Sequence, residues 1–216
     1  GLKTLIEKKF SEISIFLLII FELCYIIYII SYVLCPCEGD CIIRLLMLMR
    51  GNGTEIDMKT AIYPGSFDPI TNGHLDIIKR AGRIFDKVVV AVFYNSAKKC
   101  AFSVEERMDM ISKATHGIDN IEIVSSDKLL VHYMKERNIN VIVKGLRMVS
   151  DFEYEFQMAL ANNAQNNDIE TLFMMTSSEY LHLSSSLVRE LAHYGGDLKN
   201  LVPEAVIPHV YAKLRK

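Results

Sequence analysis

Twelve consecutive residues combine conformationally special residue types with a possible ligand for an anion. The stretch YPGSFDPITNGH runs from Tyr63 to His74, after a run of apolar and β-prone residues and before a helical pattern. Gly65 and Gly73 allow the backbone to approach a ligand without a Cβ in the way. His74 stands where a helix begins, and the free N–H groups and the dipole of a helix start favour an anion. The stretch therefore predicts a phosphate site.

On its own, this stretch is also consistent with a tight turn that carries a surface histidine. It matches neither the Gly-x4-Gly-Lys-Ser/Thr P-loop nor the Gly-x-Gly-x2-Gly dinucleotide fingerprint. A second stretch favours phosphate binding, because LSSSLVRE, residues 183–190, places three serines at another helix start. One serine would be enough to cap a helix, so three hydroxyl groups indicate a second cradle for phosphate.

Positive charge is predicted to lie near both stretches. Lys144 and Arg147 surround Gly145 at the end of one strand-like run, and Lys98 and Lys99 follow an earlier one. Ammonium and guanidinium groups bind phosphate through charge-assisted hydrogen bonds. Either pair alone is typical of a solvated basic loop. Together with the two phosphate loops, they indicate one site for a polyanion.

Five strand-like runs alternate with amphipathic helical patterns and would place these residues. We predict strands at 60–64, 87–93, 121–124, 140–145 and 171–176, and helices at 75–85, 103–115, 128–137, 150–165, 184–196 and after 203. Ser103 with Glu106, and Ser150 with Glu153, have the spacing of capping boxes. We therefore expect an α/β fold with a doubly wound five-stranded parallel sheet. Such sheets bind ligands at the carboxyl ends of their strands, near the switch in strand order.

Residues 1–57 differ in composition from the rest of the chain. An apolar run from about Ser14 to Cys35 contains one charge, Glu22, and exceeds the ~20 residues of a membrane-spanning helix. It is consistent with a membrane anchor, with a signal peptide, or with a segment outside the native protein, since Met58 directly precedes the first strand. We expect an N-terminal extension at 1–57 and a catalytic domain at 58–216.

Charge and cysteine content limit the partners and the compartment. The 24 Lys and Arg nearly balance the 26 Asp and Glu, so we expect no nucleic-acid surface. Cys100 is the single cysteine after residue 57, which suits a reducing compartment, and we expect a cytoplasmic location. The stretch CPCEGDC, residues 35–41, lacks a well-matched fourth zinc ligand, so we predict no protein-built metal site.

Four motifs together resemble bacterial phosphopantetheine adenylyltransferases, from Met58 to about Lys213. They are Thr-x-Gly-His at 71–74, KGLR at 144–147, DFEYE at 151–155 and LSSSLVRE at 183–190. The resemblance implies a Rossmann-like nucleotidyltransferase fold and transfer of AMP from ATP to 4′-phosphopantetheine. The products would be dephospho-CoA, in coenzyme A biosynthesis, and pyrophosphate. It also implies Mg²⁺ as cofactor and a homo-oligomer, generally a hexamer.

The resemblance further implies a role for individual residues. His74, Lys98 and Thr71 are the expected catalytic residues: His74 contacts the α-phosphate in the transition state, Lys98 bridges acceptor phosphate and nucleotide, and Thr71 supports the loop. The expected ATP-binding residues are Ser66, Phe67, His74, Gly145, Leu146, Arg147, Glu155, Tyr180, Leu181, His182, Leu183, Ser184, Ser185 and Ser186. The expected substrate-binding residues are Ser66, Lys98, Leu130 and Lys144, the last where many members have Arg.

This chemistry needs no general base, because a phosphate acceptor is already nucleophilic at neutral pH. The barrier comes from bringing two anions together and from charge on the α-phosphoryl oxygens, which positioned cations and N–H donors lower. We therefore expect His74 to stabilise charge through Nε2 and not to abstract a proton.

Two alternatives remain open. Another adenylyl- or cytidylyltransferase of the same superfamily, such as a nicotinate-mononucleotide adenylyltransferase, would share the histidine motif, although SSSLVRE and GLR followed by DFEYE speak against it. A non-catalytic nucleotide-binding module, tethered to a membrane by residues 14–35, would be expected to lack phosphate ligands. Here His74, Lys98, Arg147 and the serines are all present.

Overall fold

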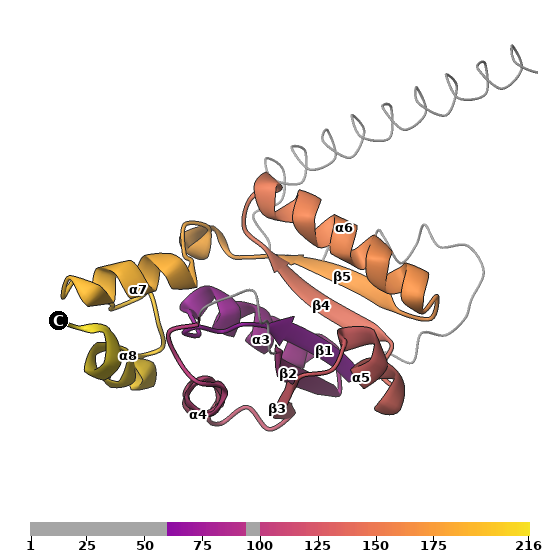
Figure 1. The fold of residues 1–216 in the computed structure, drawn as a ribbon, viewed down its shortest axis with the longest axis horizontal. Helices are drawn as coiled ribbons and strands as arrows, with labels where there is room; N and C mark the ends of the chain where they lie inside the picture. The colour runs from indigo at the N-terminus through magenta and orange to yellow at the C-terminus, as the bar shows by residue number, and fades with distance from the viewer. Residues whose placement is uncertain (1–59, 94–99) are drawn as a thin grey trace, which may run out of the picture. The chain divides into compact units, whose positions relative to one another are not determined.

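The computed structural model describes residues 60–93 and 100–216 (Figure 1). The predicted extension at 1–57, with its apolar run, lies outside the described residues, and so does Lys98. Within the described ranges, no helix has both the length and the apolar character that a membrane span requires.

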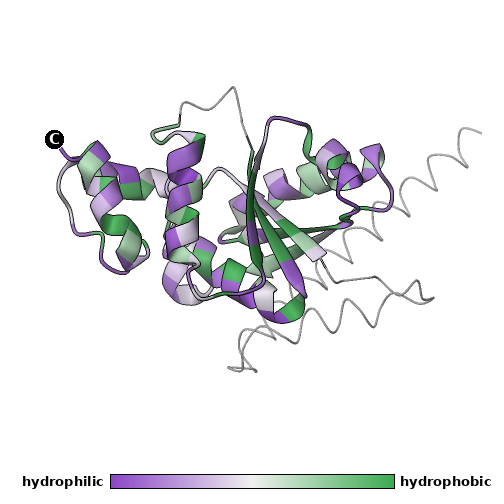
Figure 2. Ribbon diagram, turned by 90° about the horizontal axis from the view of Figure 1, so that it is seen from below, coloured by the Kyte–Doolittle hydropathy of each residue, from purple (hydrophilic) through white to green (hydrophobic). Residues whose placement is uncertain are grey.

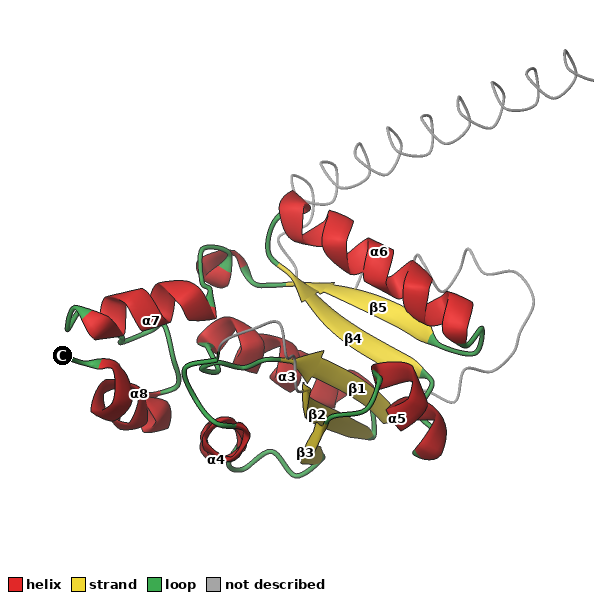
Figure 3. Cartoon of the chain, in the orientation of Figure 1, coloured by secondary structure: helices red, strands yellow, loops and turns green. Residues whose placement is uncertain are grey.

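Five parallel strands form one sheet, as the sequence predicted (Figure 3). The strands are β1 (Thr60–Gly65), β2 (Lys87–Phe93), β3 (Ile121–Ser126), β4 (Val141–Leu146) and β5 (Glu170–Met175). Their order across the sheet is β3-β2-β1-β4-β5. The middle of β2 is a run of small and β-branched residues that is buried without interruption, as in a strand covered on both faces.

The order of the strands fixes where a ligand can bind. β1 pairs with β2 along its whole length, from Thr60 beside Lys87 to Gly65 beside Val92, and it pairs with β4 on its other edge. The chain proceeds outward from β1 in one direction and from β4 in the other. The carboxyl ends of β1 and β4 therefore form the switch point at which this class of sheet binds its ligands.

Helices cover both faces of the sheet. They are α3 (Asn72–Ile84), α4 (Val104–Ala114), α5 (Leu130–Glu136), α6 (Val149–Gln165), α7 (Ser185–His193) and α8 (Ile207–Leu214), with 3-10 turns at Ser178–Tyr180 and Glu204–Val206. The larger core cluster joins one face of the sheet to α3, α4, α7 and α8, and a smaller cluster joins the other face to α5. The hydropathy colouring in Figure 2 shows mostly hydrophobic strands between these layers.

One predicted helix start is confirmed and another is wrong. The Ser103 hydroxyl accepts the Glu106 N–H, and the Glu106 carboxylate accepts the Ser103 N–H, which completes the predicted capping box of α4. α6 begins at Val149, two residues earlier than the predicted Ser150–Glu153 box requires. Its N-cap is Met148, without a side-chain cap bond, because the Met148 carbonyl already closes the first turn by accepting the Asp151 N–H.

The capping box of α4 gives a first test of the fold. Ser103→Ala removes the acceptor for an orphan helix N–H, so we expect the free energy of unfolding to fall by about 1 kcal/mol. Urea denaturation measures this. Ser125→Ala is the matched control, because Ser125 is exposed on β3 and such surface changes cost less than about 0.5 kcal/mol. Equal stability of the two variants would contradict the cap.

Candidate active site

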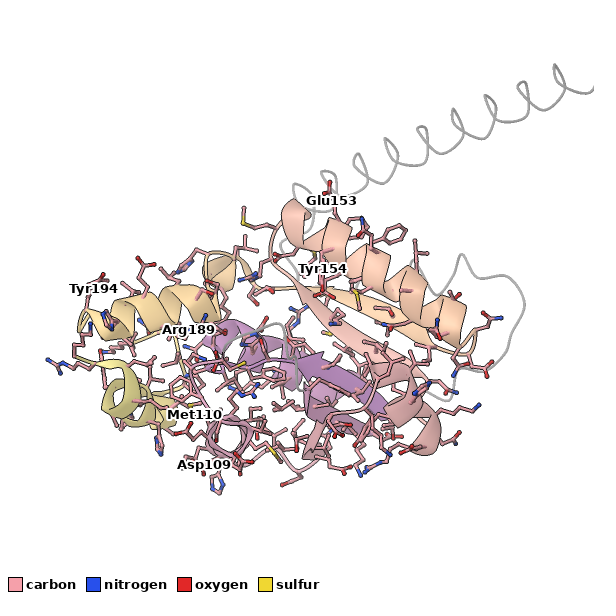
Figure 4. The ribbon with its side chains drawn as sticks, viewed as in Figure 1. Asp109, Met110, Glu153, Tyr154, Arg189 and Tyr194 are labelled. Carbon is pink, nitrogen blue, oxygen red and sulfur yellow. The ribbon has the colours of Figure 1, made fainter. Side chains whose placement is uncertain are left out.

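A cavity of about 730 Å³ lies at the carboxyl ends of β1 and β4. Residues from the loop after β1, the end of β4, α6 and the start of α7 line it. Tyr154 on α6 and Arg189 on α7, both labelled in Figure 4, belong to this lining. His74 and the three serines at the start of α7 border the same cavity, so the two predicted phosphate loops do converge.

The histidine motif is a helix capping box. The Thr71 hydroxyl accepts the His74 N–H at 3.4 Å, and the imidazole Nδ1 of His74 accepts the Thr71 N–H at 3.0 Å. The Thr71 hydroxyl also lies 3.0 Å from Nδ1. The imidazole thus takes the place that Glu or Gln has in the usual box. The same bonds that begin α3 hold the histidine ring in place.

These bonds also decide which ring nitrogen carries the proton. An Nδ1 that accepts a backbone N–H has no proton of its own, so the neutral imidazole carries its proton on Nε2. Burial, together with the smaller effect of the nearby Arg147 guanidinium, lowers the pKa of His74 from 6.5 to about 4. At neutral pH His74 is therefore an uncharged hydrogen-bond donor through Nε2.

Arg147 joins the end of β4 to two other elements. Its guanidinium forms a fork with the Asp151 carboxylate, at 3.0 and 3.2 Å, and donates to the Leu183 carbonyl just before α7. The resulting arrangement places a fixed positive charge at the cavity wall. Because a bidentate guanidinium is held in one orientation, this charge needs little rearrangement when an anion arrives.

Lys144 and Glu155 form a second ion pair in the cavity, with Nζ and Oε2 3.1 Å apart. That Oε2 is buried, and among the described residues it has no hydrogen-bond donor of acceptable geometry. The contact is thus an attraction between charges without a well-formed hydrogen bond. A carboxylate oxygen left in this condition is available to a donor or cation brought by a ligand. The burial of Tyr63 and its closeness to Glu155 raise the pKa of the phenol, which keeps Tyr63 neutral.

Each serine at the start of α7 has a separate role. Ser184 is the N-cap and accepts the Leu187 N–H at 3.1 Å. Ser185 donates to the Pro69 carbonyl at 2.8 Å and so ties α7 to the first phosphate loop. Ser186 accepts from Arg189 at 3.1 Å, and its own hydroxyl proton is unused by these contacts. The three serines therefore cap α7, connect it to the first phosphate loop and offer a hydroxyl donor to the cavity, which explains why one serine is not enough.

The cavity contains most of the site residues predicted from the sequence. They are Ser66, Phe67, Thr71, His74, Lys144, Gly145, Arg147, Glu155, Leu183, Ser184, Ser185 and Ser186. Of the predicted residues that the structure describes, five are not in the lining: Leu130, Leu146, Tyr180, Leu181 and His182. Leu146 is buried, and Leu130 packs against the smaller core cluster from the start of α5. Tyr180 lies against Gly73: a Cβ added to Gly73 would lie 3.4 Å from the Cβ of Tyr180.

Sequence reasoning missed several residues of the cavity, above all Asp68 and Arg189. The Asp68 side chain is buried and accepts the backbone N–H groups of Ala101 and Phe102 at 3.0 and 2.9 Å. Arg189 pairs with the same carboxylate at 3.2 Å. Both residues stand inside motifs that the sequence singled out, but their pairing spans 121 positions of the chain and has no local signal.

This geometry suits the transfer of a group between two phosphates. Two helix starts, one neutral N–H donor and several fixed cations face one cavity, and such groups stabilise charge that spreads over phosphoryl oxygens. Among the described residues no group of three or more His, Cys, Asp or Glu is placed to hold a metal ion.

Comparison with known proteins assigns the family. The cytidylyltransferase-like family model matches residues 62–191. The phosphopantetheine adenylyltransferase of Clostridium tetani is 58% identical over 156 residues, which cover 72% of this chain and 98% of that protein. The chain belongs to the phosphopantetheine adenylyltransferase family. The family member from Caldanaerobacter subterraneus is 54% identical over 159 residues, covering 74% of this chain and 99% of that protein.

A solved structure agrees on the fold alone. A protein from Vibrio parahaemolyticus, described as a nicotinate-nucleotide adenylyltransferase, superposes with a TM-score of 0.53 at 15% identity, over 72% of this chain and 97% of that one. This chain therefore has the Rossmann-like nucleotidyltransferase fold that the sequence predicted.

The neutral state of His74 predicts a dependence of stability on pH. The unfolded histidine binds a proton below its ordinary pKa of 6.5, whereas folded His74 does so only near pH 4. The contribution of His74 to the free energy of unfolding is therefore lost as the pH falls from 6.5 toward 4. We expect the stability of the wild type relative to His74→Gln, measured by urea denaturation, to decrease over this range.

A control separates this effect from general acid destabilisation. His116→Gln changes an exposed histidine outside the cavity, and it should keep the wild-type pH dependence. If the free energy of unfolding of His74→Gln changes with pH in parallel with that of the wild type from pH 7 to pH 4, the fold does not hold His74 neutral.

Proposed function

We propose that this chain transfers the adenylyl group of ATP to 4′-phosphopantetheine, giving dephospho-CoA and pyrophosphate. The observation that carries the proposal is the presence of His74, Lys144, Arg147 and the serine triplet around one cavity, in a chain 58% identical to a phosphopantetheine adenylyltransferase. The step forms a bond between an acceptor phosphate oxygen and the α-phosphorus of ATP. It breaks the bond from that phosphorus to the oxygen bridging to the β-phosphate.

His74 acts in this step as a hydrogen-bond donor. Its Nε2–H donates to an α-phosphoryl oxygen as negative charge increases there, and the ring stays neutral throughout. A neutral donor needs no proton transfer, in agreement with an acceptor that is nucleophilic without a base. Thr71 holds the ring in its tautomer through Nδ1.

The remaining residues bind and orient the two anions. We assign the triphosphate to the start of α7, with Ser184–Ser186, and to Arg147, and the acceptor phosphate to Lys144. Ser66 and Phe67 lie where both ligands meet in the first loop, and Gly145 and Glu155 border the nucleotide. Lys98, the predicted bridge between the two ligands, keeps that role here as a prediction. Tyr180, Leu181, His182, Leu146 and Leu130 keep their predicted ligand contacts as part of this proposal.

The residues present fit a Mg²⁺ ion that arrives with ATP. Mg²⁺ in such sites is held by one or two carboxylates together with substrate phosphates, so an all-protein cage is not needed. Both carboxylates are ion-paired, Asp151 with Arg147 and Glu155 with Lys144, but Asp151 also accepts two hydrogen bonds from Arg147, whereas the buried Oε2 of Glu155 accepts none. Glu155 would therefore be the protein ligand, and the ion would offset phosphate charge.

A substrate comparison tests the reaction. We expect pyrophosphate release from ATP with 4′-phosphopantetheine and no comparable release with nicotinate mononucleotide. His74→Ala should lower kcat by about 10²–10³, the cost of one lost donor to a developing oxyanion. His116→Ala serves as the histidine control and should leave kcat unchanged. Preference for nicotinate mononucleotide would contradict the assigned acceptor, and near-normal turnover of His74→Ala would remove His74 from the mechanism.

We also propose that the chain works as a homo-oligomer, a hexamer as the family resemblance implies, in the cytoplasm. The support is α6, which lies over β4 and β5 (Figure 1) and carries exposed apolar side chains. Among its residues with described side chains, Asn162 alone is buried. Phe156 and Leu160, four positions apart on one face of the helix, are 44% and 56% exposed, and such an apolar patch marks a contact surface.

Analytical ultracentrifugation tests the oligomer. Leu160→Asp places a charge in the uncovered face of α6, so we expect the sedimenting species to become smaller. Leu129→Asp is the matched control, because Leu129 is 53% exposed and lies outside α6. A monomeric wild type, or an oligomer that Leu160→Asp leaves intact, would contradict this contact surface.

A further inference from the structure

Phe67 has an unusual backbone conformation for its residue type. Its φ is +47°, in the left-handed region that a side chain with a Cβ adopts at an energetic cost. Phe67 is 1% exposed and sits in the middle of the first phosphate loop. A buried aromatic residue held in this conformation requires surrounding contacts that enforce it.

The conformation places the Phe67 ring against the imidazole of His74. The two ring centroids are 5.1 Å apart with planes at 69°, an edge-to-face contact, and the Tyr63 ring makes a second edge-to-face contact with Phe67 at 5.4 Å. Gly65 makes room for the ring, because a Cβ there would come within 2.8 Å of it. The Phe67 ring thus forms one wall of the position that His74 occupies.

Two arginines hold the backbone on either side of Phe67. Arg107 from α4 donates to the Ser66 carbonyl at 2.9 Å, and Arg189 from α7 donates to the Asp68 carbonyl. The Ser66 carbonyl belongs to the peptide group that leads into Phe67, so its orientation limits the φ of Phe67. Arg189 also pairs with the Asp68 carboxylate, which fixes the residue that follows.

Arg107 has no other evident reason to be buried. It is 3% exposed, and in the described part of the chain its hydrogen bonds go to two backbone carbonyls, Ser103 and Ser66. The Glu105 carboxylate attracts it without forming an ion pair with it. Burying a charge without a hydrogen-bonded counterion opposes folding. It is outside the cavity lining, so direct contact with a ligand does not explain its position either.

We propose that Arg107 and Arg189 are positioning residues that hold Phe67 in its left-handed conformation, so that the Phe67 ring fixes the imidazole of His74. We call these two arginines the Phe67 clamp. This inference rests on the proposed function, since it assigns the clamp to the reaction of the same site. Arg107 acts from outside the cavity, through Ser66 and Phe67, on the group that contacts the α-phosphate.

A double-mutant cycle in kcat tests the clamp. Arg107→Met should lower kcat by about tenfold to a hundredfold, as expected for misplacement of a catalytic group, and change the KM for ATP far less. Arg107→Lys should recover only part of this loss, because an ammonium lacks the planar fork that reaches two carbonyls. In a Phe67→Ala background, Arg107→Met should have almost no further effect, because the residue through which it acts is gone.

Other results would overturn the clamp. A normal kcat in Arg107→Met would contradict it. Full activity of Arg107→Lys would mean that the charge alone matters. An equal fold-decrease in kcat from Arg107→Met in the wild-type and Phe67→Ala backgrounds would show that Arg107 does not act through Phe67. If Arg107→Met does not fold, Arg107→Lys replaces it in the same cycle. Arg137→Met is the control, because Arg137 is an exposed arginine paired with Glu122 far from the loop, and it should leave kcat unchanged.

A readout that is independent of turnover separates this inference from the proposed reaction. Nuclear Overhauser contacts between the Phe67 and His74 rings should be present in the wild type and lost in the Arg107 variants while the remaining spectrum is preserved. Unchanged contacts in those variants would contradict the clamp. A wild type that shows these contacts but no turnover of ATP with 4′-phosphopantetheine would instead contradict the proposed function.

Discussion

The hydrogen bond from the Thr71 N–H to Nδ1 of His74 is the interaction on which the site depends. It ends the loop that leaves β1, begins α3, orients the imidazole and leaves the ring proton on Nε2. One contact therefore links helix formation to chemistry. A Glu at the same position would cap the helix equally well but would bring a negative charge toward a phosphate, where a neutral donor is needed.

The electrostatics around this contact are consistent with a neutral histidine among cations. Burial and the Arg147 guanidinium both keep the imidazole uncharged at neutral pH by lowering its pKa. The cations of the cavity are held by carboxylates: Arg147 by Asp151, Lys144 by Glu155, and Arg189 by Asp68. Such pairing reduces the cost of keeping cations in a partly buried place and fixes their positions before a ligand arrives.

The sequence was sufficient for the architecture and for most of the cavity. Continuous β-branched runs and helical spacing predicted the five strands and their parallel pairing, and the Ser103–Glu106 box was found from spacing alone. The Thr71–His74 box was missed because the usual signature requires Glu or Gln at its last position, and the Ser150–Glu153 box was wrong because a backbone bond closes that turn first.

What the sequence could not predict depends on contacts between distant segments. The bonds of Arg107 and Arg189 to the first loop span 41 and 121 positions and involve backbone carbonyls, which leave no residue pattern to detect. Leu130 was placed at the site by resemblance; it packs partly buried against the smaller core cluster, and its ligand contact stays a prediction. Local patterns identify helix starts and strands, whereas the packing of α4 and α7 decides how the loop between β1 and α3 is held.

The tautomer of His74 is the most direct test of the account. Nitrogen-15 chemical shifts of the imidazole, assigned by comparison with His74→Gln, report which ring nitrogens carry protons at pH 7. The account predicts an unprotonated Nδ1 and a protonated Nε2. A His74 ring that is protonated on both nitrogens, or on Nδ1 alone, would contradict it.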